Sequence, residues 1–141
     1  MEIDQSKVSE TRIAYISMEI GLESNIPTYS GGLGVLAGDT VRSAADLEVP
    51  MVGVCLCYST GYFHQLFNER GEQKEKEIEW SFFYEFDKVE QPIEMQIEDH
   101  NLKVSAWLYR VVGQSGHVVP IYLLTTEVEG NEPWKQKLTG S

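Results

Sequence analysis

The sequence predicts an α/β fold in which a parallel sheet is interrupted by inserted antiparallel strands. Three observations predict it. An apolar run, a glycine-rich loop, a helical pattern and a second apolar run follow one another within residues 11–60, as in a βαβ unit. Residues 61–117 alternate between apolar and polar positions and carry turn signals, which is typical of antiparallel strands. A third apolar run then begins the segment 118–141 and predicts a return to the parallel sheet.

The βαβ unit is expected to open with a strand over residues 12–18 (RIAYISM), which is rich in β-forming residues. A loop follows, and a helix is then predicted from Leu33 to shortly before Pro50. The apolar positions at helical spacing are Leu33, Leu36, Ala37, Val41, Ala44 and Ala45. The continuous run MVGVCLCY predicts a strand that is covered on both faces and parallel to the first.

The inserted region is expected to begin with a hairpin that turns near Asn68–Gly71, followed by a solvated charged run at 71–80. Strands are predicted at 93–99 and 102–109, with turns at 99–101 and 113–116. After the return strand, a helix is expected to start with Asn131 as its cap and Pro133 in its first turn. We expect residues 1–141 to form a single, incomplete domain that stops inside this helix; a frayed tail is the alternative.

The composition narrows the class of function. The chain has 141 residues and a formal net charge of -11, which argues against nucleic acid or an anionic membrane as a general partner. The N-terminus, MEIDQSKVSE, lacks the apolar core of a signal peptide. Cys55 and Cys57 share one face of the predicted strand, where a disulfide between them would be strained. We therefore expect reduced, buried thiols in a cytoplasmic protein, and no partners complete a metal site around them.

The stretch YSGGLGVLAGD, residues 29–39, places four glycines where the helix begins. Glycine in a helix interior costs roughly 1 kcal/mol relative to alanine, so these residues need another reason. Gly31 and Gly32 allow the backbone to turn sharply and approach a ligand, and the N–H groups of a first helical turn favour a phosphate or a sugar oxygen. Gly34 and Gly38 are expected to form a flat stripe that packs on the sheet. A tight turn without a ligand is equally open, because neither the dinucleotide nor the P-loop spacing is present.

Glu19 is the second candidate, since it ends the first strand and is expected on the same rim as the glycine loop. Its carboxylate is suited to accept hydrogen bonds from sugar hydroxyls or from loop amides that it orients. A purely structural anchor is the slightly favoured alternative from the residues alone. Asp39 is expected to be a surface or packing residue. His64, His100 and His117 are scattered, and nothing pairs them into a catalytic triad or a metal site.

Three joined patterns carry a resemblance to a known family. They are S-x-E-x-G-L at 17–22, Y-S-G-G-L-G-V-L-A-G-D at 29–39 and G-Y-F-x-Q at 61–65. With the sequence between them, from AYISMEIGL to STGYFHQ, they closely resemble the N-terminal region of α-glucan phosphorylases, which act on glycogen, starch or maltodextrin. The resemblance is greatest to the shorter bacterial and archaeal type. It is specific over residues 12–65 and weaker through VVPIYLLTT and NEPWKQKLT.

The resemblance implies a partial Rossmann-like sheet from the N-terminal domain of the GT-B architecture, in which two such domains face a cleft. Members of the family are glycosyltransferases that use inorganic phosphate to release glucose 1-phosphate from α-1,4-glucan. Pyridoxal phosphate is bound to a lysine of the C-terminal domain, which is missing here, so no bound cofactor is expected. The resemblance places Gly31, Gly32, Leu33 and Glu19 against phosphate and glucose, and it carries over no catalytic residue.

The expected function is therefore the glycine-loop half-site of a phosphorylase, inactive without the missing domain and prone to self-association through uncovered apolar surface. A non-catalytic module that binds phosphate or α-glucan and a ligand-free structural fragment are the alternatives. One departure from the family is notable. Glu48 stands where DLGVP has a glycine that ends the helix in a left-handed conformation, so a cost of about 1 kcal/mol is expected if that conformation is kept.

Overall fold

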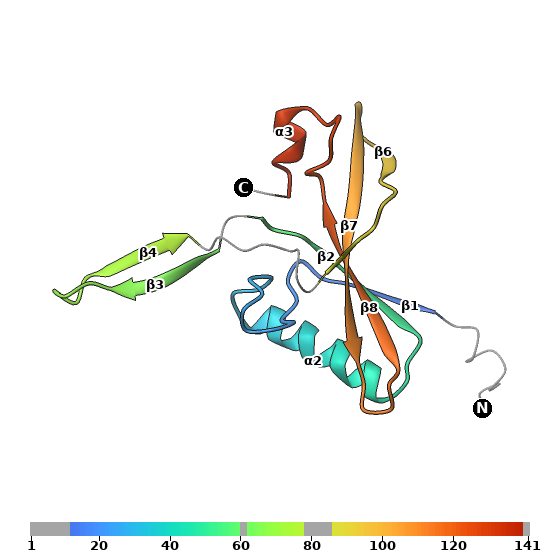
Figure 1. The fold of residues 1–141 in the computed structure, drawn as a ribbon, viewed down its shortest axis with the longest axis horizontal. Helices are drawn as coiled ribbons and strands as arrows, with labels where there is room; N and C mark the ends of the chain where they lie inside the picture. Colours follow the sequence, from blue (N-terminus) through green and yellow to red (C-terminus); the bar gives the residue numbers. More distant parts are fainter. Residues whose placement is uncertain (1–11, 60–61, 78–85, 140–141) are drawn as a thin grey trace.

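A computed structural model describes residues 12–59, 62–77 and 86–139 (Figure 1). The elements in chain order are β1 (Ile13–Ile16), α2 (Gly32–Asp46), β2 (Met51–Leu56), β3 (Phe63–Phe67), β4 (Gln73–Glu77), β5 (Asp87–Lys88), β6 (Ile93–Ile97), β7 (His100–Val112), β8 (Val118–Thr125) and α3 (Pro133–Gln136). None of the helices in these ranges is long and apolar enough to cross a membrane.

The main sheet is mixed, with strand order β1-β2-β8-β7-β5 and β6 paired to the outer part of β7. Strands β1, β2 and β8 are parallel, whereas β7 runs antiparallel to β8. The predicted α/β class and the parallel βαβ pair are confirmed. The strand predicted at 102–109 is longer than expected, because β7 has 13 residues and starts at His100. Its register with β8 extends the parallel sheet by a fourth strand, so the inserted region partly belongs to the same sheet.

Helix α2 packs on one face of this sheet (Figure 1). Four of its predicted apolar contacts, Ala37, Val41, Ala44 and Ala45, are buried. Leu33 and Leu36 share the helical spacing but are 56% and 62% exposed. The buried stripe runs instead through small residues, Gly34, Ala37 and Gly38, because the loop before the helix lies against them.

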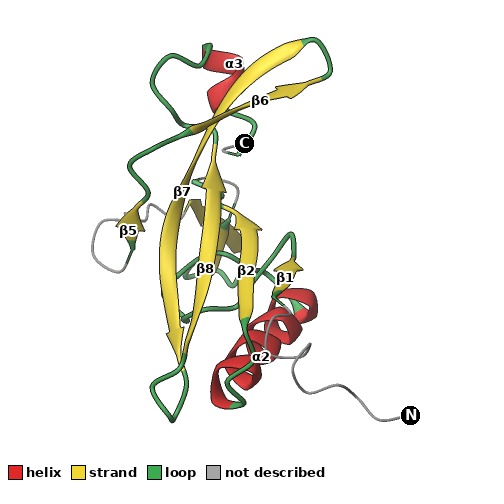
Figure 2. Cartoon of the chain, turned by 90° about the vertical axis from the view of Figure 1, so that its right-hand side faces the viewer, coloured by secondary structure: helices red, strands yellow, loops and turns green. Residues whose placement is uncertain are grey.

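The opposite face of the sheet carries a row of apolar side chains that the register aligns across four strands. Ile16 pairs with Val54, Val54 with Tyr122, and Tyr122 with Leu108. Ile16 is 77% exposed, and the other three are partly exposed. Figure 2 shows this face with no described helix lying across it. Parallel strands are normally covered on both faces, so this surface is exceptional for its class.

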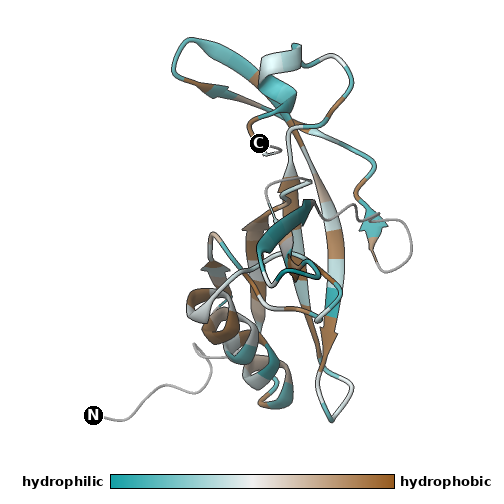
Figure 3. Cartoon of the chain, turned by 90° about the vertical axis from the view of Figure 1, so that its left-hand side faces the viewer, coloured by the Kyte–Doolittle hydropathy of each residue, from teal (hydrophilic) through white to brown (hydrophobic). Residues whose placement is uncertain are grey.

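Strands β3 and β4 form a separate two-stranded sheet that projects from the rest of the chain. The turn falls where it was predicted: the N–H of Gly71 donates to the carbonyl of Asn68 at 2.9 Å, and Gly71 has φ +76°. The Asn68 side chain accepts from the N–H groups of Arg70 and Glu72. Figure 3 shows the hydrophilic character of β4, which fits the predicted solvated run over its described part, 71–77, whereas β3 exposes the apolar side chains of Phe63, Leu66 and Phe67.

Helix α2 is followed by a residue in left-handed conformation, which is the position where the resemblance noted above has a glycine. Glu48 has φ +56°, and its N–H donates to the carbonyl of Ala45 at 3.3 Å. The N–H of Val49 donates to the carbonyl of Ala44 at 2.9 Å. These two bonds form a Schellman motif, which satisfies carbonyls that the helix end leaves unpaired. The left-handed conformation is thus kept although the residue is not glycine.

The prediction that Asn131 caps the last helix was wrong. The N-cap of α3 is Glu132, and Pro133 occupies the first turn as predicted. Asn131 is buried instead, because its amide bonds the backbone of a neighbouring strand. Its Oδ1 accepts from the Lys103 N–H at 3.0 Å, and its Nδ2 donates to the carbonyls of Lys103 and Thr126. A side chain that bridges two segments in this way leaves no group for the helix.

Candidate functional site at the carboxyl edge of the parallel strands

The glycine loop ends in an open helix N-terminus. Gly31 is the N-cap of α2, in extended conformation with φ -162° and ψ -165°. A Cβ built on Gly31 or Gly32 would meet no heavy atom within 4 Å. Among the described residues, the N–H groups of Gly32 and Leu33 have no hydrogen-bond acceptor, whereas the N–H of Val35 begins the helical series at 3.2 Å from the Gly31 carbonyl. Neither sterics nor backbone angle within the described chain therefore requires glycine at these positions.

Glu19 lies on the same rim, as predicted. Its carboxylate accepts from the Ser30 N–H at 3.4 Å and from the Ser30 hydroxyl at 3.3 Å. Ser30 directly precedes the N-cap of α2, so the end of the first strand is tied to the start of the helix. Of the expected roles for this carboxylate, orientation of the loop is the one for which the structure shows contacts.

Gly34 and Gly38 pack on the preceding loop and not on the sheet, which corrects the sequence prediction. The N–H of Gly21 donates to the Gly34 carbonyl at 2.8 Å. A Cβ on Gly34 would collide with the Tyr29 side chain, and one on Gly38 would collide with the Gly21 carbonyl. Gly38 is needed because backbone meets backbone at this crossing, and Gly34 because the Tyr29 side chain lies against it.

Arg42 closes the same crossing, and sequence reasoning missed it. Its guanidinium donates through Nη1 to the Gly21 carbonyl at 3.0 Å and through Nη2 to the Leu22 carbonyl. Its spacing, four residues after Gly38 and eight after Gly34, places all three on one helical face and was the available signal. The loop is also fastened to itself, because the N–H of Ile20 donates to the Thr28 carbonyl at 3.1 Å.

A thiol of β2 and two tyrosines that follow this strand lie near Glu19. The rings of Tyr58 and Tyr62 meet edge to face with centroids 6.0 Å apart, and the Cys55 thiol donates to the Met18 carbonyl at 3.4 Å. Burial raises the pKa of Cys55 from its ordinary 9.0 to about 12, and the Glu19 charge adds to this. Burial, and then the charge of Glu19, also raises the pKa of Tyr62. These groups are therefore neutral at physiological pH.

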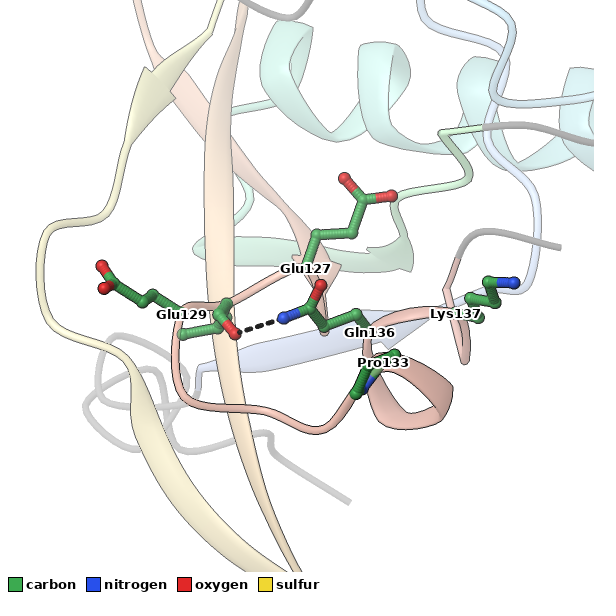
Figure 4. Close-up of a pocket in the computed structure, with 6 residues that line it drawn as sticks. Glu127, Glu129, Pro133, Gln136 and Lys137 are labelled. Carbon is green, nitrogen blue, oxygen red and sulfur yellow. Dashed lines mark hydrogen bonds between the residues drawn. The ribbon is translucent and has the colours of Figure 1, made fainter.

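The end of β8 contributes a second carboxylate to this edge. Glu127 accepts a hydrogen bond from the Ser59 hydroxyl, which joins the segments that follow β8 and β2. Beside it is an open cavity of about 340 Å³ lined by Glu127, Val128, Glu129, Pro133, Gln136 and Lys137 (Figure 4). The Gln136 amide donates to the Val128 carbonyl at 3.4 Å across this cavity. The lining has acidic and basic side chains but no aromatic ring.

The remaining candidates do not join the site. Asp39 is exposed, as expected. The His117 ring nitrogen Nε2 lies 3.1 Å from the Val49 carbonyl, and the His100 ring contacts Trp134, so each has a separate environment. The side chain of His64 lies outside the described residues. Within the described part of the chain, no cluster of three or more histidine, cysteine or acidic residues is arranged to hold a metal ion.

Fold and site together define an α/β domain with an open glycine loop at the carboxyl edge of its parallel strands, where such domains bind ligands. Residues 14–130 match the carbohydrate phosphorylase family, and the chain belongs to that family.

Several curated proteins are similar to this chain. It is 36% identical over 137 residues to the maltodextrin phosphorylase of Thermococcus litoralis, a match that covers 88% of this chain and 15% of that protein. It is 52% identical over 65 residues to the glycogen phosphorylase of Mycobacterium tuberculosis, a match that covers 46% of this chain and 8% of that protein. It is 29% identical over 144 residues to the glycogen phosphorylase of Aquifex aeolicus, a match that covers 90% of this chain and 19% of that protein. The chain thus spans less than a quarter of the length of each of these relatives.

Proposed function

We propose that this chain is the N-terminal part of an α-1,4-glucan phosphorylase and supplies the glycine-loop half of its phosphate and glucose site. The reaction is phosphorolysis, in which inorganic phosphate takes the terminal glucose of the glucan as α-glucose 1-phosphate. In this proposal the sheet is part of a GT-B N-terminal domain, and a second domain faces it across the substrate. The family membership and the two named phosphorylase activities among the relatives support the proposal.

The observation that most directly supports the proposal is the open space around Gly31 and Gly32. Glycine at these positions is not explained by the fold, since a Cβ on either would touch no described atom. A requirement for bare backbone is explained when a ligand lies against it. The N–H groups of Gly32 and Leu33 begin α2, and the helix adds partial positive charge at this end. Phosphate and sugar oxygens are the groups that such a surface binds.

The chain's own residues then have distinct tasks. The amides of the glycine loop hold the anionic oxygens, and they do so without reorganisation because the loop is clamped to α2 through Gly21 and Arg42. Glu19 orients Ser30 and so fixes the entry to the loop. Leu33 is 56% exposed and offers an apolar contact beside the amides. In this proposal none of these groups transfers a proton, and no catalytic residue is assigned to this chain.

Pyridoxal phosphate does not fit the residues present. A lysine must bind its aldehyde, yet residues 17–36, which form the loop and the first turn of α2, contain no lysine. Described lysines lie on β4, β5 and β7, within α3 and directly after it. We therefore place the cofactor on a lysine outside this chain, and we derive no step through it. A half-site cannot position both reactants, so the isolated chain is inactive in this proposal.

The test is a nuclear magnetic resonance titration of the 141-residue chain with phosphate and with maltoheptaose. The amide signals of Gly31, Gly32 and Leu33 are expected to shift at millimolar ligand. Gly32→Val is expected to keep the dispersed spectrum, since the position is open, and to lose the shifts. Ser43→Val is the matched control, because it places the same side chain on an exposed part of the same helix. Unchanged shifts in Gly32→Val, or none in the parent chain, contradict the proposal.

Two further properties complete the proposal. The bare sheet face that contains Ile16, Val54 and Tyr122 promotes self-association of the isolated chain, because it leaves apolar surface in water. Size-exclusion chromatography is expected to show species larger than a monomer, and a compact, stable monomer speaks against this.

We also place the protein in the cytoplasm, since Cys55 and Cys57 are both free thiols.

A further inference from the structure

The β3–β4 arm has an open sheet edge along β3, which the function proposed above does not use. Strand β3 pairs with β4 on one side and with no described strand on the other, and the arm projects from the rest of the chain (Figure 1). The sequence of β3, FHQLF, has no acidic residue, lysine or arginine, whereas β4 reads QKEKE. Phe67 is 74% exposed, and Phe63 and Leu66 are about half exposed. Exposed edge strands are normally protected by charges, so an uncharged and aromatic edge indicates a partner.

The hydrogen bonds of the arm show which backbone groups of β3 are open. The N–H of Asn68 donates to the Glu72 carbonyl at 3.0 Å, at the end of the ladder that joins the two strands. Hydrogen-bonded and non-hydrogen-bonded pairs alternate along such a ladder, so the even-numbered residues of β3 bond to β4. The N–H and carbonyl groups of Phe63, Gln65 and Phe67 therefore point away from β4, and no described residue outside the arm bonds to them.

This edge is complementary to a second copy of itself. When two β3 strands pair antiparallel about a twofold axis at Gln65, Phe63 lies opposite the partner's Phe67, and Phe67 lies opposite the partner's Phe63. The outward groups of all three positions then meet in hydrogen-bonded pairs. The two arms become one four-stranded sheet, in which cross-strand aromatic pairs add stability. An isolated two-stranded hairpin is only marginally stable in water, so the arm itself is stabilised by this pairing.

The other edge of the arm is not suited to such pairing. A twofold axis that relates two antiparallel strands keeps each side chain on its own face of the sheet. Lys74 and Lys76 share one face of β4, and Glu75 lies on the other. A pairing centred on Glu75 places this residue opposite its own copy and each lysine opposite a lysine, and like charges directly opposite destabilise a sheet. The charges of β4 thus direct a second copy to β3.

We propose that two copies of this chain associate through β3, in an antiparallel register centred on Gln65, so that their arms form one four-stranded sheet. The pair is closed, because the twofold axis uses the uncharged edge of each arm. This contact is separate from the bare sheet face that contains Ile16, Val54 and Tyr122, and it involves no residue of the glycine loop.

Disulfide cross-linking of the 141-residue chain tests the register. In the proposed pair the Cα atoms of the two Gln65 residues are about 5.5 Å apart, a distance that a disulfide spans. Gln65→Cys is expected to give a covalent dimer on a non-reducing gel after mild oxidation. Glu75→Cys is the matched control, since this exposed position is paired with Gln65 but borders the other edge of the arm. It is expected to remain monomeric, as is the parent chain, whose cysteines are buried. Equal cross-linking of both variants, or none in Gln65→Cys, overturns the proposal.

A charge exchange tests the same register without relying on one cysteine position. In the Gln65→Cys background, Phe63→Lys alone and Phe67→Glu alone are each expected to reduce the yield of covalent dimer roughly fivefold or more, because both aromatic cross-strand pairs are lost. The double variant Phe63→Lys, Phe67→Glu places opposite charges in each of these pairs and is expected to recover part of the yield. Unchanged yields in the single variants, or no recovery in the double variant, contradict the register.

The outcomes also separate this contact from the other proposals. Association through the bare sheet face alone predicts no dependence of the cross-link on Phe63 or Phe67. Open filaments instead of dimers would mean that β3 pairs with the partner's β4, which overturns the closed pair. The amide titration of the glycine loop is measured independently, so failure of the arm contact leaves the proposed function standing, and the reverse also holds.

Discussion

The carbonyl oxygen of Gly21 lies against the Cα of Gly38, so near that a Cβ on Gly38 would fall well inside 3.0 Å of it. One residue of the loop thereby touches α2 through its oxygen and, by donating from its N–H to Gly34, through its nitrogen as well. Gly38 is thus explained by a close approach of two backbone segments. This contact determines whether replacing Gly38 by alanine raises or lowers the free energy of unfolding.

Gly38→Ala is expected to destabilise the chain by about 1–3 kcal/mol, because the methyl group overpacks the crossing. Helix propensity alone predicts the opposite, a gain of about 1 kcal/mol. The free energy of unfolding, measured in urea by circular dichroism, distinguishes the two. Ser43→Ala on the exposed part of α2 is the control and is expected to change stability by less than about 0.5 kcal/mol. A stabilised Gly38→Ala variant would show that the helix and loop are not in close contact.

Glu48→Gly is expected to raise the free energy of unfolding by about 1 kcal/mol. The reason is that Glu48 holds φ +56°, which glycine adopts without the steric cost paid by other residues. Thermal and urea unfolding both report it. Glu69→Gly, in the turn of the β3–β4 hairpin, is the comparison and is expected to give no gain, since Glu69 is not among the described positive-φ residues. Loss of stability in Glu48→Gly would mean that its side chain matters more than its backbone.

Asn131→Ala is expected to cost about 1–3 kcal/mol, because it leaves backbone groups of Lys103 and Thr126 without their partner in a buried place. Asn131→Asp keeps the acceptor but removes both donated bonds, so most of the loss is expected to remain. Asn101→Ala is the control, because Asn101 is an exposed asparagine on β7. Differential scanning calorimetry gives the comparison, and equal melting temperatures for Asn131→Ala and Asn101→Ala would contradict the bridging role.

Stability is expected to fall as the pH rises above about 9. The folded state holds the Cys55 thiol neutral, with a pKa near 12 against an ordinary 9.0, and the pKa of Cys57 is raised in the same direction. Above pH 9 the unfolded chain loses these protons and the folded chain does not, so proton release favours unfolding. Urea midpoints between pH 8 and 11 test this against a Cys55→Ala, Cys57→Ala double variant, in which the decline should be shallower. Rapid alkylation of the native thiols at pH 8 would contradict their burial.

Much of the architecture follows from local patterns in the sequence. The runs that became β1, β2 and β8 are apolar, as is typical of strands in a parallel sheet, although only one face of β2 is covered in the described chain and not both as predicted. The loop that separates the first two strands is marked by glycine and proline. The hairpin turn at Asn68 was predictable because the asparagine side chain and Gly71 serve the turn locally. Such features need no knowledge of distant residues.

The site was predictable only in part. The nearness of Glu19 to the glycine loop follows from the edge rule for parallel strands, but its contact with Ser30 does not. The partners of Gly38 and Asn131 could not be predicted, because each depends on a segment brought near by the whole fold. The exposure of Leu36 could not be predicted for the same reason: hydrophobicity favours a buried position, yet close approach of the loop selects small residues for the buried stripe.

The β3–β4 arm has a practical consequence. Its strands pair only with each other among the described strands, and its turn is closed by its own Asn68. A peptide tag or a fluorescent reporter inserted between Glu69 and Arg70 therefore extends a self-contained finger and leaves the register of the six-stranded sheet intact. The arm is thus a suitable place for immobilising the protein without altering the sheet that carries the glycine loop.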